Sequence, residues 1–256
     1  MALVVNTNIA SLNAQRNLET STNALGRIDL PLHAMPAPAR YKLVVSLEGT
    51  AFENDWDVWV YPPAERVATV PPANIALTSV WDDAARTTLE AGGSVCLMIP
   101  PDRVRPDPRK GPIALGFSSI FWNTAWTNGQ APHTLGILCD PKHPALSAFP
   151  TDAFSNWQWW YPIRHAAAMI LDGLPAELRP TVQVVDDWFA NRKLALVFEA
   201  RVGRGKLLVT SIDLGDAALD PVRRQLRASL FDYLASPRFH PSVIVTPDQV
   251  RGLITE

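Results

Sequence analysis

Residues 75–100 read IALTSVWDDAARTTLEAGGSVCLMIP, and this stretch decides the expected fold. Its first six residues read as a short strand, and Asp82 or Asp83 can cap a helix that runs through Leu89. Two consecutive glycines end that helix, and the apolar run SVCLMIP that follows is typical of a buried strand. A strand, a helix and a second strand in this order predict a βαβ unit and, with it, a parallel sheet.

The segments after this unit extend the pattern. Gly203 and Gly205 lie in the turn of a predicted β-hairpin, and residues 220–235 form the clearest helix, because Asp216 or Asp220 can cap it. The other expected elements are a helix over residues 165–171 and strands over residues 135–139, 181–185, 194–200 and 207–212. Together these elements predict a doubly wound α/β domain with a mostly parallel sheet.

The chain before residue 64 is organised differently. Residues 41–49 (YKLVVSLEG) and 57–61 (DVWVY) alternate in the manner of strands. Residues 1–25 carry a narrow stripe of apolar side chains, typical of an amphipathic helix that pairs with another helix. The expected organisation is an N-terminal helix over residues 1–26, a β-strand segment that is a remnant of a β-sandwich over residues 27–63, the α/β domain over residues 64–238 and a tail over residues 239–256.

Composition limits the function classes. The 256 residues are 47% hydrophobic and 19% charged with a net charge of −2, which suits a globular protein with a sizeable core. A pI of about 6.2 disfavours a nucleic-acid partner, because it provides no overall positive field. No apolar run has the length of a membrane span, and residues 1–25 lack the regions of a secretory signal. Two cysteines exclude a disulfide scaffold.

Tryptophan is concentrated in residues 117–161. Aromatic faces stack on the C–H surfaces of sugars, while Asn, Gln and His side chains bond hydroxyl groups, so this segment predicts a saccharide-binding surface. Read as a strand, NWQWW places Trp157 and Trp159 on one face and Gln158 and Trp160 on the other. The candidate saccharide-binding residues are Trp122, Asn123, Trp126, His133, His143, Trp157, Gln158, Trp159 and Trp160.

These tryptophans have an alternative interpretation as large, rigid core residues. The two interpretations predict different exposure. If the segment binds sugar, at least one tryptophan should be exposed beside His133 or His143, on the C-terminal edge of the sheet where α/β domains bind ligands.

A metal centre is not expected. His133, Asp140 and His143 have metal-binding side chains, but prolines at positions 141 and 144 interrupt the helix that such a histidine pair would need. The spacing also matches no standard zinc pattern. No cofactor of any kind is expected, and no residue is assigned a catalytic role.

Two weaker patterns concern catalysis. Cys139 ends a predicted strand, where His133 or His143 could serve as a base, so a Cys–His hydrolase or transferase is one alternative. Glu199 lies in one predicted strand and Asp186 and Asp187 end another, so Glu199 could form a carboxylate pair with one of them.

The N-terminal segment VNTNIASLNAQRNL, residues 5–18, resembles the start of bacterial flagellin. The resemblance ends at Gly26 and implies a helix of the filament core that is exported without cleavage. It also implies a bacterial source and self-association through this helix. A flagellin-related surface or interaction protein is therefore a second alternative.

A longer resemblance covers residues 28–238. This part of the chain looks like the C-terminal region of β-galactosidase-like glycoside hydrolases of family two. The segments that carry the resemblance are NDWDVWVYP, FWNTAWT, TLGILCDPKHPAL, NWQWW and NRKLALVFEARVG. The resemblance implies an accessory α/β module with the outline of a glutamine amidotransferase but without its Cys–His–Glu set. The family's catalytic glutamates lie on a barrel of about 250 residues, and no segment here matches that barrel.

The expected function is therefore that of a non-catalytic accessory region of a β-galactosidase-like glycoside hydrolase. Its role would be structural or weakly saccharide-binding. The partners that these patterns suggest are a saccharide and a second copy of the chain.

Overall fold

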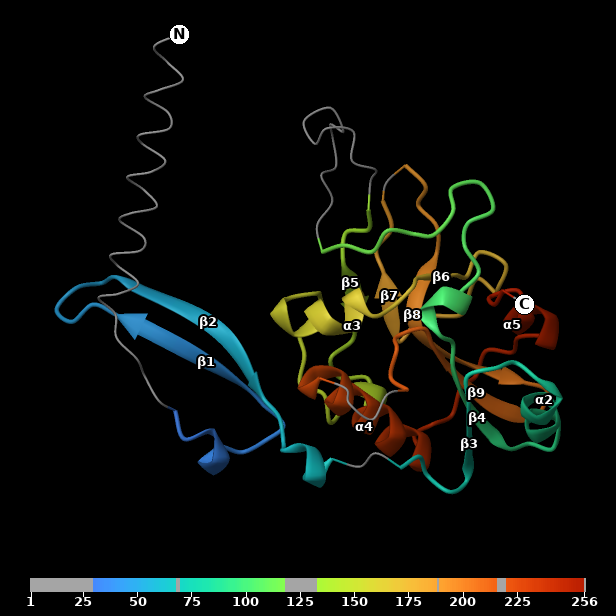
Figure 1. The fold of residues 1–256 in the computed structure, drawn as a ribbon, viewed down its shortest axis with the longest axis horizontal. Coiled ribbons are helices and arrows are strands. Elements are labelled where there is room, and N and C mark those ends of the chain that lie inside the picture. The colour runs from blue at the N-terminus through green and yellow to red at the C-terminus, as the bar shows by residue number, and fades with distance from the viewer. Residues whose placement is uncertain (1–29, 68–69, 118–132, 188, 216–219, 256) are drawn as a thin grey trace, which may run out of the picture. The chain divides into compact units, whose positions relative to one another are not determined.

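The computed structural model describes residues 30–67, 70–117, 133–187, 189–215 and 220–255 (Figure 1). Its contacts divide the chain into residues 1–35 and residues 36–256, and the architecture below is that of the second unit. The described part of the first unit contains one short 3-10 helix, η1 (Leu32–Ala34). The helix expected over residues 1–26 lies outside the described residues.

A seven-stranded mixed sheet is the centre of the second unit. Its order is β3 (Ile75–Thr78), β4 (Ser94–Met98), β9 (Gly205–Thr210), β8 (Leu194–Val202), β7 (Val182–Val184) and β5 (Ile137–Cys139), and β6 (Met169–Ile170) also pairs with β8. The β3–β4 and β4–β9 pairs are parallel, whereas β9–β8, β8–β7, β7–β5 and β6–β8 are antiparallel.

The expected doubly wound, mostly parallel fold, with its amidotransferase-like outline, is wrong. The βαβ unit is present, because α2 (Asp83–Glu90) connects the parallel strands β3 and β4 and its Asp82 cap accepts from Ala85 N at 2.9 Å. Beyond β4 the sheet is mostly antiparallel. A parallel pair needs a crossover of a dozen or more residues, whereas β8 and β9 are joined through a tight turn at Gly203.

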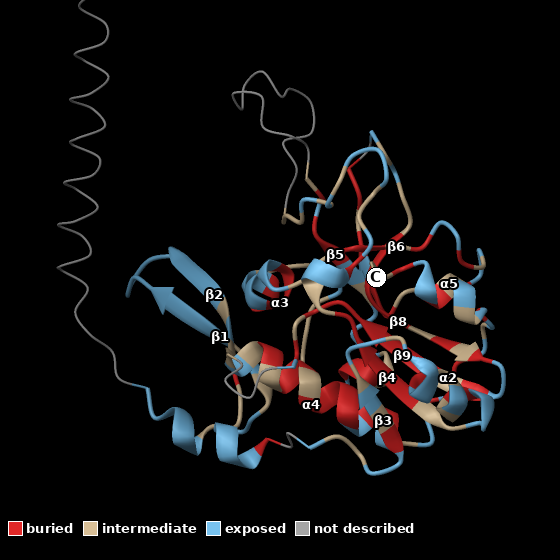
Figure 2. Ribbon diagram, turned by 45° about the vertical axis from the view of Figure 1, so that its right-hand side comes forward, coloured by how far each residue is buried: buried red, intermediate tan, exposed pale blue. Residues whose placement is uncertain are grey.

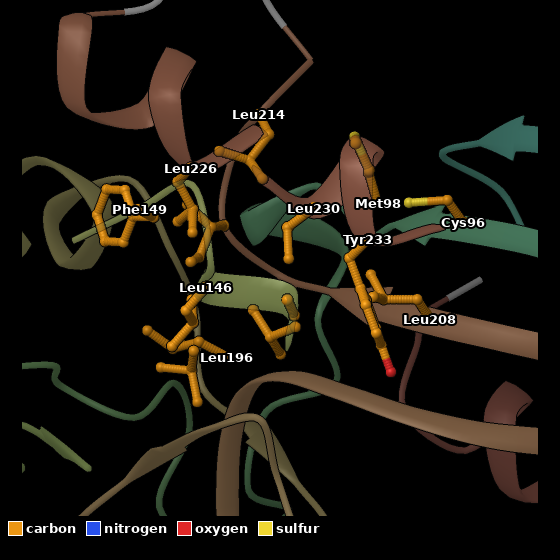
Figure 3. Close-up of a cluster of buried hydrophobic side chains, with 14 of the residues drawn as sticks. Cys96, Met98, Leu146, Phe149, Leu196, Leu208, Leu214, Leu226, Leu230 and Tyr233 are labelled. Carbon is orange, nitrogen blue, oxygen red and sulfur yellow. The ribbon is translucent and has the colours of Figure 1, made fainter. Parts of the chain in front are cut away.

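The core lies on both faces of this sheet. Cys96 and Met98 of β4 belong to the cluster that α4 (Pro221–Ala235) covers, while Val95 and Leu97 belong to the cluster that α2 covers. Because successive strand residues point to opposite faces, the two helices lie on opposite sides. Figure 2 shows the buried residues concentrated in the central strands and α4. Figure 3 shows the packing of the α4 side, with Leu226 among the labelled core residues.

The remaining elements surround the sheet. The segment expected to be a helix over residues 165–171 instead contains strand β6, and the preceding helix ends at Arg164. Val245, Val250 and Leu253, in the segment expected to be a tail, are buried against the α2 side of the sheet. These other elements are η2 (Ala64–Arg66), η3 (Pro101–Arg103), η5 (Pro144–Leu146), η6 (Trp157–Trp159), α3 (Trp160–Arg164) and α5 (Pro247–Arg251). No described helix is long and apolar enough to cross a membrane.

A two-stranded hairpin, β1 (Ala39–Ser46) and β2 (Glu53–Val60), precedes the main sheet. One face carries the ion pairs Arg40–Asp57 at 2.7 Å and Lys42–Asp55 at 3.0 Å. The opposite face is apolar and exposed, and it includes Leu43, Val45, Trp56 and Val58. A two-stranded sheet is marginal by itself, and here Trp59 Nε1 donates to the carbonyl oxygen of Pro150 at 2.8 Å.

Gly205 and Gly203 provide a matched pair for testing the approach of α2 to β9. A Cβ at Gly205 would lie 2.5 Å from both the Cα and the carbonyl oxygen of Leu89, whereas Gly203 has open space and a φ of 58°. We expect Gly205→Ala to reduce the free energy of unfolding by about 3 kcal/mol through overpacking. Gly203→Ala should cost about 1 kcal/mol through left-handed backbone strain. Urea unfolding of both variants measures the difference, and equal losses would contradict this close approach.

Candidate functional site

The NWQWW segment is helical, so its expected strand geometry is wrong. Asn156 begins the 3-10 helix η6, because its side chain accepts from Gln158 N at 3.0 Å and donates to Asp152 Oδ2 at 2.8 Å. In a 3-10 turn, residues three apart share a face. Trp157 and Trp160 are therefore the exposed pair, with 79% and 40% of their surface accessible, while Gln158 and Trp159 are buried.

The buried half of this segment anchors it to the core. Trp159 is fully buried, its Nε1 donates to Thr151 Oγ1 at 2.8 Å, and its ring lies edge-on to Phe149 with the centroids 5.5 Å apart. Gln158 Nε2 donates to Tyr61 Oη at 2.8 Å and to the Pro150 carbonyl at 2.7 Å. The proposed sugar contacts of Gln158 and Trp159 are therefore wrong, because both side chains are enclosed by protein.

The exposed half forms what we call the aromatic surface, defined by Phe117, Trp157, Trp160 and Tyr161. Trp160 stacks on Phe117 with centroids 5.4 Å apart and an interplanar angle of 20°. The guanidinium of Arg164 lies over the Trp160 ring, 5.1 Å from its centroid. Trp157 and Tyr161 expose 79% and 47% of their surface. One helical segment thus presents several aromatic side chains to solvent.

The two candidate histidines have different surroundings. His143 Nδ1 accepts from Ala145 N at 3.2 Å, which caps η5, and its ring lies edge-on to Tyr233 of α4 at 5.6 Å. His133 lines a cavity of about 380 Å³ together with Asp187 and Arg192. His143 therefore has a structural role in packing against α4. Trp122, Asn123 and Trp126 lie outside the described residues.

The expected carboxylate pair is engaged elsewhere. Arg192 donates to both oxygens of Asp186 at 2.8 and 3.0 Å and forms an ion pair with Asp107 at 2.9 Å. Burial alone would raise the pKa of Asp186, but the hydrogen bonds from Arg192 outweigh it and lower that pKa. Glu199 accepts from Tyr233 Oη at 2.5 Å. These contacts assign both carboxylates to structural ion pairs and hydrogen bonds.

Cys139 is poorly suited to act as a nucleophile. Its Sγ donates to the carbonyl oxygen of Asp152 at 3.3 Å, and burial together with the charges of Asp140 and Asp152 raises its pKa to about 12. A thiol must ionise to react as a nucleophile. Cys96 is fully buried, and burial raises its pKa to about 12 as well. In the described ranges, no group of three or more His, Cys, Asp or Glu side chains is placed to hold a metal ion.

A second cavity, of about 480 Å³, lies at the carboxyl ends of the parallel strands β3, β4 and β9. Its lining includes the apolar Met98 and Leu214 and the carboxylates of Asp102 and Asp213. Asp213 Oδ2 lies 3.5 Å from Arg223 Nη1. Sequence reasoning missed this cavity, although the ends of the segments 75–80 and 94–100 mark the edge where parallel sheets bind ligands.

Trp157 and Trp159 should differ sharply in their effect on stability. We expect Trp159→Ala to reduce the free energy of unfolding by about 3–5 kcal/mol, because it leaves a cavity in the core. Trp157→Ala should change it by about 0.5 kcal/mol or less, because the side chain is mostly solvated. Chemical denaturation of the two variants provides the measurement. A large loss of unfolding free energy in Trp157→Ala would show that the Trp157 side chain is buried rather than exposed.

Cys139 should resist alkylation in the folded protein. With a pKa of about 12, only about one thiol in ten thousand is ionised at pH 8. Iodoacetamide followed by mass spectrometry should therefore label Cys139 far more slowly than a free thiol, while both cysteines react in denaturant. Native labelling at the rate of an exposed cysteine would restore Cys139 as a candidate nucleophile.

Comparison with protein families gives two matches. Residues 7–62 match a domain of unknown function (DUF8488), and residues 76–255 match a second domain of unknown function (DUF8487). Curated proteins provide no match to the chain. The second match contains the aromatic surface, both cavities and the seven-stranded sheet. Only the first residue of β3 lies outside it. Because it spans more than half of the 256 residues, the chain belongs to the family described as domain of unknown function DUF8487.

Proposed function

We propose that this protein is a non-catalytic accessory module that binds saccharide through the aromatic surface. The observation that carries the proposal is the exposure of Trp157, at 79%, on a segment whose next two residues are buried. A large apolar ring that a rigid backbone segment holds in water is available for stacking on the C–H face of a sugar. Saccharide binding offsets the cost of that exposure by removing apolar area from water.

The rigidity of the backbone segment that carries Trp157 supports the proposal. Trp159 and Gln158 together make three hydrogen bonds to Thr151, Tyr61 and Pro150. These bonds fix the backbone from which Trp157 projects, so little further conformational entropy is lost when a ligand binds. Weak, millimolar binding is the expected regime, because a single stacking ring contributes limited buried area.

The role within a larger assembly follows the sequence resemblance. An accessory region of a β-galactosidase-like glycoside hydrolase would bring saccharide to a catalytic domain without taking part in the reaction. The raised pKa of Cys139 and its hydrogen bond to a backbone carbonyl weigh against the Cys–His alternative. The flagellin-related alternative depends on residues 1–25, which lie outside the described residues.

Saccharide titration tests the proposal. Lactose and a soluble β-galactan, added to the full chain, should quench tryptophan fluorescence with a Kd in the millimolar range, which corresponds to about −4 kcal/mol. Trp157→Ala should abolish the quenching without unfolding the protein. Calorimetry of the same titrations provides an independent measure of binding.

Trp56→Ala is the matched control. Trp56 lies on β2, exposes 45% of its surface and lies outside the aromatic surface, so its removal should leave saccharide binding unchanged. Equal loss of binding in both variants would indicate nonspecific adsorption to exposed tryptophan. Absence of binding by any saccharide in the intact protein would reject the saccharide-binding function.

A further inference from the structure

We infer that the aromatic surface selects acidic saccharides, with Arg164 binding the carboxylate of a uronate residue. The inference rests on the proposed saccharide-binding function and specifies its substrate class. Trp157, Trp160, Tyr161 and Arg164 occupy positions i, i+3, i+4 and i+7 along η6 and α3. Residues at this spacing lie along one face of a helix. The aromatic side chains and the guanidinium therefore form one continuous stripe.

Stacking on Trp160 orients the guanidinium of Arg164. Its Cζ lies 5.1 Å from the centroid of the Trp160 ring, and Phe117 stacks on the same ring. A guanidinium held over an aromatic ring keeps its N–H donors in its own plane, where they remain available to an acceptor at the edge. Arg164 is therefore positioned to donate two parallel hydrogen bonds to a carboxylate.

Among the described residues, no carboxylate forms an ion pair with Arg164 and no acceptor bonds its guanidinium. Arg40, Arg192 and Arg223 differ, because each of them pairs with an aspartate. The sequence of residues 118–132, which follows Phe117, contains no Asp or Glu. Asp152, at the opposite end of the segment, already pairs with Arg40 and Asn156.

A uronate residue combines the two features that this stripe recognises. Its ring has a C–H face that can stack on Trp157, and its carboxylate projects from the ring edge toward a donor. A neutral sugar would use only the stacking surface. An acidic oligosaccharide lying along the stripe would gain a charge-assisted bidentate contact in addition, so it should bind more tightly.

The test compares two ligands on the full chain by calorimetry. An oligogalacturonate and a neutral oligogalactan of equal length should bind with Kd values at least tenfold apart at low salt, with the acidic ligand tighter. Raising the ionic strength should reduce this ratio, because salt screens the exposed charge pair. Arg164→Gln should bring the ratio close to one, because the carboxylate loses its charge-assisted donor. Arg66→Gln, which removes an exposed charge on η2, should preserve the ratio.

The outcomes separate this inference from the proposed function. If the neutral ligand binds as tightly as the acidic one, the selectivity for uronate is wrong while saccharide binding stands. If neither ligand binds, both proposals are rejected. If polyglutamate binds as tightly as oligogalacturonate and Trp157→Ala leaves its binding intact, Arg164 recognises acidic polymers in general and the assignment of a saccharide is wrong.

Discussion

Burial of the strands β4, β9 and β8 on both faces is the constraint on which the rest of the structure depends. Val95, Cys96, Leu97 and Leu208 are all fully inaccessible to solvent, so α2 and α4 must cover opposite faces. The apolar area removed from water is the main favourable contribution to folding. The packing of these strands against the helices also tolerates no added side-chain atom at some positions, as the close approach of Leu89 to Gly205 illustrates. The segment that carries the aromatic surface is held against this core by Trp159, which is fully buried and packs against Phe149.

The candidate site lies where that core ends. Within one short helical segment, Trp159 points into protein and Trp157 points into solvent, and the buried residue stabilises the position of the exposed one. Binding surfaces benefit from such an arrangement, because a side chain on a fixed backbone loses less entropy when a ligand arrives. The polar network of Arg192, Asp186 and Asp107 has a different role. It holds the loop between β7 and β8 and fixes the wall of the cavity beside His133.

The β1–β2 hairpin differs physically from the domain that follows it. Its charged face carries two ion pairs within the hairpin and one from Arg40 to Asp152, whereas its apolar face exposes Leu43, Val45 and Trp56. The remnant of a β-sandwich expected for residues 27–63 stays a prediction, because the hairpin is a two-stranded sheet by itself. Its contacts with the rest of the unit are polar as well as aromatic, since Trp59 Nε1 donates to the Pro150 carbonyl and Tyr61, directly after β2, stacks on Phe149. These contacts explain how so short a sheet is maintained.

The sequence by itself determined the local elements: the βαβ unit, the hairpin at Gly203 and the helix capped by Asp220 all form where caps, glycines and apolar periodicity indicated. Tertiary structure decided the direction of the other strands, because the pairing of distant segments does not depend on local propensity. It also decided which tryptophans are exposed. The three tryptophans of NWQWW are equally hydrophobic, and only the 3-10 turn begun by Asn156, together with the partners of Trp159, separates the buried ring from the exposed ones. The stacking of Arg164 on Trp160 likewise arises from the helix that succeeds this turn, whereas a strand would have placed the two residues differently.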